Sequence, residues 1–251
     1  VNDVVRIPGN RGGTIALVDI DARRLDITSR LIRKLLRHLR RKNWKVLASP
    51  DRAEVLADSD YVINCIEVSG LECVRWDNDI PLKYGVDQCI GDTIGPGGLF
   101  KALRTIPVWL AVLKDCERLC PNALVLNYTN PMAMMCLAAA RTSSMNVVGL
   151  CHSVQATSHL LAGYTGVPHA ELEWECAGIN HLAWFTTLAH RGRDLYPSLK
   201  QKFAAELAEG IRESDAGLVV ADATDISHGA VAPVRYQQTD LIRKDMCVHF
   251  G

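Results

Sequence analysis

The chain has 251 residues, 28 basic and 28 acidic side chains, a formal net charge of zero, and 48% hydrophobic residues. This composition is ordinary for a folded globular protein and gives no electrostatic reason to expect nucleic acid or a membrane surface as a partner. The apolar runs are too short to span a bilayer, and the nine cysteines are scattered without a CxxC pair. We therefore expect a cytoplasmic protein with free thiols rather than a disulfide framework.

Short apolar runs alternate with amphipathic segments along the first 150 residues. Strands are predicted at 14–20, 44–48, 61–66, 123–127 and 146–150, and helices at 21–41, 51–58, 99–119 and 131–141. Strands that alternate with helices imply right-handed crossovers and a doubly wound parallel sheet. The predicted fold class is α/β, with a Rossmann-like sheet.

The texture of the sequence changes after Gly166. Residues 172–176 and 182–188 indicate strands on either side of a turn, 198–211 indicates a helix, and no clear period follows Ser214. The sequence therefore predicts a Rossmann-like domain over residues 1–150 and the beginning of a second, α+β domain over residues 151–251.

An acidic residue after the second strand of a Rossmann sheet binds the ribose hydroxyls of a dinucleotide. Asp19 has this place, and Asp21 is the alternate, although Asp21 also suits the N-cap of the next helix. The glycine-rich phosphate loop is missing: Gly9, Gly12 and Gly13 precede a strand and do not form GxGxxG. Residues 1–6 resemble the end of a helix, so either the chain is truncated or the sheet lacks its first strand.

Two further stretches carry candidate ligands. Gly149-Leu150-Cys151-His152-Ser153 and Gly178-Ile179-Asn180-His181 each follow a short apolar run, and thiolate and imidazole are metal ligands. For any of these residues alone, a buried free cysteine or a hydrogen-bonded histidine is the plainer explanation. The glycine-rich stretch 91–98 before a helix suits either an anion site or a flexible loop.

Taken together, these motifs resemble glycoside hydrolase family 4, whose members depend on NAD and a divalent metal. The resemblance covers residues 14–188 and rests on Val18-Asp19-Ile20-Asp21, Asp92-Thr93-Ile94-Gly95-Pro96-Gly97-Gly98, Arg104-Thr105-Ile106-Pro107, Asn127-Tyr128-Thr129-Asn130-Pro131-Met132, Gly149-Leu150-Cys151-His152-Ser153 and Cys176-Ala177-Gly178-Ile179-Asn180-His181. It implies that NAD⁺ takes hydride from C3 of the sugar, a base removes the C2 proton, the glycosidic oxygen leaves, water adds and the hydride returns.

The resemblance also implies roles for individual residues. Cys151 and His181 would bind the metal, which is Mn²⁺ in the family, although ligand chemistry alone favours Zn²⁺ or Fe²⁺. His152 is the candidate general acid, because imidazole titrates near neutrality, with an orienting role as the alternative. The remaining candidates are Asp19, Asp21 and Asn127 for the cofactor, Asp92 and Asn130 for the substrate, and Tyr236 as the C2 base. Helix capping is the alternative for Asn130.

The residue after the metal-binding cysteine varies with substrate in the family. Cys151-His152-Ser153 resembles the branch that acts on non-phosphorylated sugars, and most of all the α-galactosidases; α-glucosidase, α-glucuronidase and α-galacturonidase remain alternatives. The resemblance also implies a homo-oligomer. Two other hypotheses stay open: an NAD-dependent hydroxyacid dehydrogenase that uses Arg104 to bind its substrate, and a truncated homologue without catalysis.

Overall fold

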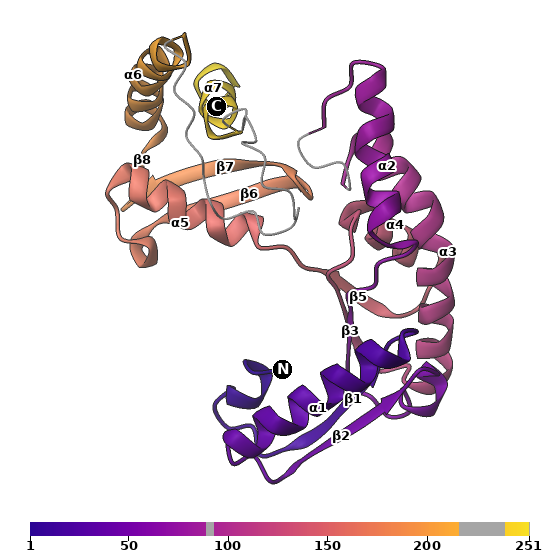
Figure 1. Cartoon of the computed structure of the whole chain (residues 1–251). Coiled ribbons are helices and arrows are strands. Elements are labelled where there is room, and N and C mark those ends of the chain that lie inside the picture. Colours follow the sequence, from indigo (N-terminus) through magenta and orange to yellow (C-terminus); the bar gives the residue numbers. More distant parts are fainter. Residues whose placement is uncertain (89–92, 216–238, 251) are drawn as a thin grey trace. The chain divides into compact units, whose positions relative to one another are not determined.

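A computed structural model describes residues 1–88, 93–215 and 239–250 (Figure 1). These residues form two compact units, one of residues 1–83 and 93–150, the other of residues 84–88, 151–215 and 239–250. Each unit has its own cluster of buried apolar side chains. Within the described ranges, no helix is both long and apolar enough to cross a membrane.

The first unit alternates strands and helices (Figure 1). Its elements are η1 (Val4–Arg6), β1 (Gly13–Val18), α1 (Ala22–His38), β2 (Trp44–Ser49), η2 (Arg52–Glu54), β3 (Tyr61–Asn64), α2 (Gly70–Lys83), α3 (Gly95–Leu119), β4 (Leu124–Asn127), α4 (Met132–Thr142) and β5 (Asn146–Gly149). All the strand pairs are parallel, which confirms the predicted α/β class.

The strands form two ladders rather than one continuous sheet within the described residues. β1 pairs with β2, and β3, β4 and β5 pair in that order. The Rossmann fold has the strand order 3-2-1-4-5-6. In that order, β2 corresponds to strand 3 and β1 to strand 2. The strands β3, β4 and β5 correspond to strands 4, 5 and 6. In the second ladder Asn64, Asn127 and Gly149 lie in register at the carboxyl ends, so polar side chains gather at that edge.

A single cluster around α3 holds the three-stranded ladder to its helices. Trp109 and Leu113 of α3 pack against Val125 of β4 and Met135 of α4, and all four are almost completely buried. The Trp109 indole N–H donates to the Met135 carbonyl at 3.1 Å, so the largest core side chain also satisfies its polar atom. This packing fixes the strand ends that carry the candidate residues.

Some predicted elements differ from the structure. The helix predicted at 51–58 is only the single turn η2, because Asp51 caps the Ala53 amide and the chain then turns away. α3 begins at Gly95, earlier than predicted, with Pro96 in its first turn, and it continues past Pro107. The prediction had no helix at α2, whose sequence contains Pro81.

The second unit is an antiparallel sheet packed with helices. Its elements are α5 (Ser153–Thr165), η3 (His169–Glu171), β6 (Glu173–Ile179), β7 (Leu182–His190), β8 (Arg193–Asp194), α6 (Tyr196–Asp215) and α7 (Thr239–Phe250). Leu188 of β7, Ala162 of α5, and Leu199 and Phe203 of α6 form its buried core. This core sets α5 and the β6–β7 hairpin at fixed places within one unit.

Candidate active site

The start of α5 and the turn of the β6–β7 hairpin bring a thiol and an imidazole together. The Cys151 Sγ atom lies 3.3 Å from Nε2 of His181, although thirty positions separate the two residues in the sequence. Cys151 directly precedes the helix N-cap His152, and His181 ends the two-residue turn between β6 and β7. The two side chains predicted as metal ligands are therefore neighbours within one compact unit.

The environment of Cys151 favours the thiolate. Partial burial raises the pKa of the Cys151 thiol, but hydrogen bonds from the Ser153 side chain and amide, Asn180 and His181 outweigh burial and lower it to about 6. The Ser153 Oγ atom lies 3.2 Å from the sulfur, and its amide donates at 3.5 Å. A cysteine at a helix N-terminus with several donors is the ordinary setting for a metal-binding or reactive thiolate.

The hairpin turn holds His181 in an unusual backbone conformation. His181 has a φ of 61°, in the left-handed region that a non-glycine residue occupies at a cost on the order of 1 kcal/mol. Gly178 lets the two strands approach, since a Cβ there would lie 2.6 Å from the Leu182 carbonyl oxygen and from the Ala183 Cα atom. The strained backbone conformation of His181 thus places its imidazole beside Cys151.

Asn180, the other turn residue, contributes a polar atom that sequence reasoning did not assign. Its side chain hydrogen-bonds to the Cys151 sulfur, while its Oδ1 atom is buried and has no hydrogen-bond partner within the described residues. A buried acceptor without a partner is costly, and such atoms in binding sites commonly face a ligand. Its position next to His181 was the only sequence signal for this role.

The donor set fits a divalent transition metal. Two ligands about 2.0 to 2.3 Å from one ion, subtending 90–110°, lie roughly 3.1 to 3.6 Å apart, and the Cys151–His181 distance falls in this range. Within the described residues, no third His, Cys, Asp or Glu joins them. Other donors, such as water, Asn180 Oδ1 or substrate oxygens, would complete the coordination, which leaves open positions of the kind a catalytic metal needs.

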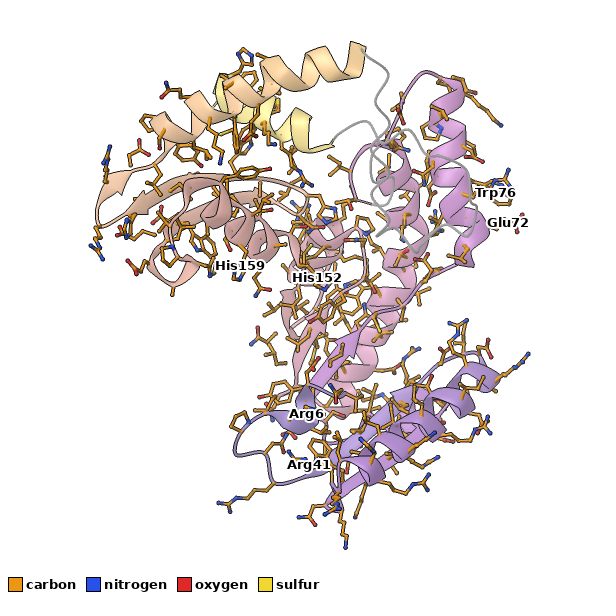
Figure 2. The ribbon with its side chains drawn as sticks, turned by 60° about the vertical axis from the view of Figure 1, so that its left-hand side comes forward. Arg6, Arg41, Glu72, Trp76, His152 and His159 are labelled. Carbon is orange, nitrogen blue, oxygen red and sulfur yellow. The ribbon has the colours of Figure 1, made fainter. Side chains whose placement is uncertain are left out.

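The candidate general acid lies at the start of α5. His152 is the N-cap residue, and its exposed imidazole makes no capping hydrogen bond. Figure 2 shows it at the beginning of the helix that also carries His159. His152 directly follows Cys151 in the chain, so its role as general acid stays a prediction.

In the first unit, the Asn127 side chain, which the sequence predicts to contact the cofactor, is part of a buried network. Asn127 is 0% exposed; its Oδ1 accepts from Asn64 Nδ2 at 2.7 Å and from the Thr129 amide, and its Nδ2 donates to the Thr129 carbonyl. A side chain so enclosed links the carboxyl ends of β3 and β4 through hydrogen bonds. Asn64 and Thr129 are therefore its structural partners.

Asn130 hydrogen-bonds to the first residue of α4, although Pro131 is the N-cap residue of that helix. Its Oδ1 accepts from the Met132 amide at 3.3 Å, where α4 begins after a cis peptide bond to Pro131. The residue is only half-buried, so a substrate contact is not blocked.

The two acidic residues after β1 have different partners. Asp21 caps α1, because its Oδ1 accepts from the amides of Arg23 and Arg24. Asp19 Oδ1 accepts from the Asp21 amide, and its Oδ2 lies 3.5 Å from Arg24. Asp19 stays half-buried at the carboxyl end of its strand, the place from which ribose hydroxyls are bound in this fold.

The hypothesis of a hydroxyacid dehydrogenase loses its substrate-binding arginine. Arg104 forms a two-pronged ion pair with Asp77, whose side chain is 6% exposed, so the Arg104 guanidinium already has a carboxylate partner.

The glycine-rich stretch before α3 is explained in part by close packing. A Cβ on Gly98 would lie 2.7 Å from the Thr93 carbonyl carbon. The candidates Asp92 and Tyr236 lie outside the described residues.

Comparison with known protein families assigns the chain to one family. The model of the family 4 glycosyl hydrolases matches residues 1–167, and that of the C-terminal domain of the same family matches residues 176–251. This protein therefore belongs to glycosyl hydrolase family 4, as the sequence motifs predicted.

Characterised relatives refine the comparison. The chain is 42% identical over 192 residues to an α-galactosidase of Bacillus subtilis and 39% identical over 192 residues to one of Rhizobium meliloti, with 76% of this chain covered in each case. An α-galacturonidase of Thermoanaerobacter italicus is 33% identical over 196 residues, 75% of the chain. These matches span 44%, 39% and 42% of the relatives, so the chain covers less than half of their length.

The fold is shared with solved members of the family. A 6-phospho-α-glucosidase from gut microorganisms, solved in complex with NAD and Mn²⁺, is 27% identical, with a TM-score of 0.67 over 75% of this chain and 43% of that one.

Proposed function

We propose that this protein is an NAD- and Mn²⁺-dependent glycoside hydrolase that cleaves α-galactosides. Membership of family 4, two α-galactosidases at 42% and 39% identity, and the sequence Cys151-His152-Ser153 support the proposal. The observation that carries it is the 3.3 Å approach of the Cys151 sulfur to the His181 ring. Without that pair, the described part of the chain would have no evident place for the metal.

Each residue has a definite task in this proposal. Cys151 and His181 hold the cation, and the buried Asn180 Oδ1 faces either the cation or a sugar hydroxyl. When bound, the metal would stabilise negative charge on sugar oxygens as a Lewis acid, and NAD would accept and return a hydride. Asp19 binds the ribose hydroxyls of the dinucleotide.

Proton transfer falls to His152 and Tyr236. His152 donates a proton to the leaving glycosidic oxygen and recovers it from water, which suits an imidazole near neutral pH. Tyr236 remains the proposed base for the C2 proton, and Asp92 and Asn130 the proposed substrate contacts. We also propose that the protein assembles as a homo-oligomer.

The test is hydrolysis of 4-nitrophenyl α-galactoside by the whole chain under reducing conditions. Cleavage is expected only when NAD⁺ and Mn²⁺ are both present, and galactose released in D₂O should carry deuterium at C2. Matched 4-nitrophenyl α-glucoside and α-galacturonide report on the alternative substrates. Cleavage that needs no NAD⁺ would exclude the family mechanism, while a folded, metal-binding protein without any activity would favour the non-catalytic homologue.

Two cysteine variants separate the metal site from general thiol effects. Cys151→Ser should abolish Mn²⁺ binding and activity together, because it removes the thiolate ligand. Cys247→Ala, on α7, should retain both, because its thiol is a partly buried packing group whose pKa burial raises. Equal activity in the two variants would count against Cys151 as a ligand.

A further inference from the structure

The end of α1 and the start of β2 form a strongly basic, concave surface on the first unit. A cavity of about 440 Å³ is lined there by the cationic side chains of Arg33, Arg37, Arg40, Arg41 and Lys42. A second cavity of about 300 Å³ shares Arg40, Arg41 and Lys42 and adds Arg11. None of the residues that line either cavity is acidic, so the two cavities carry one sign of charge in a chain whose net charge is zero.

These cations lack carboxylate partners, whereas carboxylates pair with arginines in the first half of the same helix. Near the start of α1, Arg24 pairs with Asp19 and Asp21, and Arg30 pairs with Asp26. Within the described ranges, no carboxylate lies within ion-pairing distance of the cations that line the cavities: Arg11, Arg33, Arg37, Arg40, Arg41 and Lys42. Unneutralised guanidinium groups facing a shared hollow repel one another and favour an anion between them.

Tertiary contacts bring Arg11 to this surface. The Asn43 side chain donates to the Arg11 carbonyl at 3.3 Å, and the Gly13 amide donates to the Asn43 carbonyl at 3.1 Å. The loop before β1 is thereby tied to the loop after α1. The hollow has an apolar floor, since Leu36, Trp44 and Val46 line it and belong to one core cluster.

Arg40 occupies a position where glycine is usual. The amides of Arg40 and Arg41 donate to the carbonyls of Arg37 and Leu36, which is the hydrogen-bond pattern that closes a helix with a left-handed residue. Arg40 is that residue, with a φ of 53°. Cations near a helix C-terminus do stabilise the helix dipole, but Arg37 in the last turn already supplies one, and the effect does not require a strained arginine.

The surface is distinct from the proposed dinucleotide site. Asp19 and Asp21 stand at the beginning of α1, while the cavities lie at its end, and a helix of 17 residues is about 25 Å long. An anion bound at the end of α1 would therefore leave the acidic residues at its start free.

We infer that this surface binds a small molecule through an oligophosphate group, carried by a nucleotide or free. Arginine forks bind phosphate oxygens in pairs, and several forks around one hollow suit two or three linked phosphates better than one. A cavity of this size lies at the lower end of the range for small-ligand sites, and the exposed part of the Trp44 ring offers a flat apolar wall to a base. An extended nucleic acid would need a longer basic track than the two adjoining cavities provide.

The test measures binding of tripolyphosphate and of ATP to the whole chain by isothermal titration calorimetry. Arg41→Glu/Lys42→Glu reverses two cations common to both cavities, and Lys34→Glu/Lys45→Glu makes the same charge change on neighbouring exposed residues that line neither. We expect the first variant to weaken tripolyphosphate binding by at least about tenfold and the control by less than about twofold. Arg41→Gln/Lys42→Gln, a milder change, should lie between wild type and Arg41→Glu/Lys42→Glu.

Comparing the two ligands and the variants distinguishes a nucleotide from a free oligophosphate and tests the competing explanations. Tighter binding of ATP than of tripolyphosphate, with the difference lost in Trp44→Leu, assigns the site to a nucleotide; equal binding assigns it to a free oligophosphate. NAD⁺ affinity should stay unchanged in all variants. Equal weakening in the control, no binding at millimolar tripolyphosphate, or much tighter binding of a single-stranded oligonucleotide of random sequence would each overturn the inference.

Discussion

Arg104 of α3 and Asp77 of α2 form a two-pronged ion pair in which the carboxylate is almost completely enclosed and the arginine is partly buried. Arg104 Nη1 donates to Asp77 Oδ1 at 2.8 Å, and Nη2 donates to the second carboxylate oxygen. The hydrogen bond from Asp77 raises the pKa of the Arg104 guanidinium further above its ordinary value, against the effect of burial. This pair joins α2, which the sequence did not predict, to the long helix of the first core.

Removing one partner of this pair should be strongly destabilising. We expect Asp77→Ala to lower the free energy of unfolding by about 2 kcal/mol, because it leaves a partly buried guanidinium without its hydrogen-bonded carboxylate. Urea denaturation measures the effect. Asp79→Ala on the same helix removes only an exposed pair with Arg75 and should cost less than about 1 kcal/mol; similar losses in the two variants would mean that burial does not distinguish the pairs.

The Cys151 thiol should be the most reactive of the cysteines that the structure describes, in the metal-free protein. With a pKa of about 6, it is roughly nine-tenths thiolate at pH 7, whereas burial raises the pKa of Cys116 to about 12. Its alkylation by iodoacetamide should stay fast down to about pH 6 and decline below, because the thiol then takes up its proton.

Mn²⁺ should protect this cysteine, since a metal-bound sulfur is a poor nucleophile. Peptide mass spectrometry, with the exposed Cys65 as the internal reference, follows each site separately. Labelling of Cys151 no faster than Cys65, or no slower with Mn²⁺, would contradict the site geometry.

Two glycines of the second unit should respond in opposite ways to alanine. At Gly178, with φ 137°, an added Cβ collides with backbone atoms of Leu182 and Ala183, so Gly178→Ala should destabilise the hairpin by more than about 2 kcal/mol and weaken Mn²⁺ binding through His181. Gly163 lies within α5 with open space around it, so Gly163→Ala should stabilise the protein by up to about 1 kcal/mol.

Thermal melting together with Mn²⁺ titration checks this pair of variants. A Gly178→Ala protein that melts and binds Mn²⁺ like the wild type would show that the turn tolerates a Cβ and does not position His181.

Arg40→Gly should separate stability from ligand binding. Glycine adopts the left-handed conformation of residue 40 without strain, so the variant should gain up to about 1 kcal/mol of stability in urea denaturation. It also removes one cation from both cavities and should weaken tripolyphosphate binding. A variant that is no more stable than the wild type would show that the arginine side chain makes a compensating contribution.

Much of this protein could be predicted from its residues in order. Apolar runs at 14–20, 61–66, 123–127 and 146–150 correspond to β1, β3, β4 and β5, because short apolar runs between helical segments are typical of the strands of a parallel sheet. Cys151 and His181 could be singled out because their residue types and their places after strands are characteristic of a site. α2 and α5 were not predicted, since Pro81 and a run of small and polar residues obscure their helical period.

The tertiary structure decided what those side chains do. Asn127 and Asn130 occur in one motif, yet packing encloses Asn127 in a buried network and leaves Asn130 half-exposed at a helix start. Three other features depend on contacts between residues far apart in the chain. They are the hydrogen bond of Asn180 to Cys151, the ion pair of Arg104 with Asp77, and the cavity that Arg11 and Arg41 line together. Local sequence sets backbone preference and burial. Hydrogen bonds between distant residues and clusters of like charge form only when the chain folds back on itself.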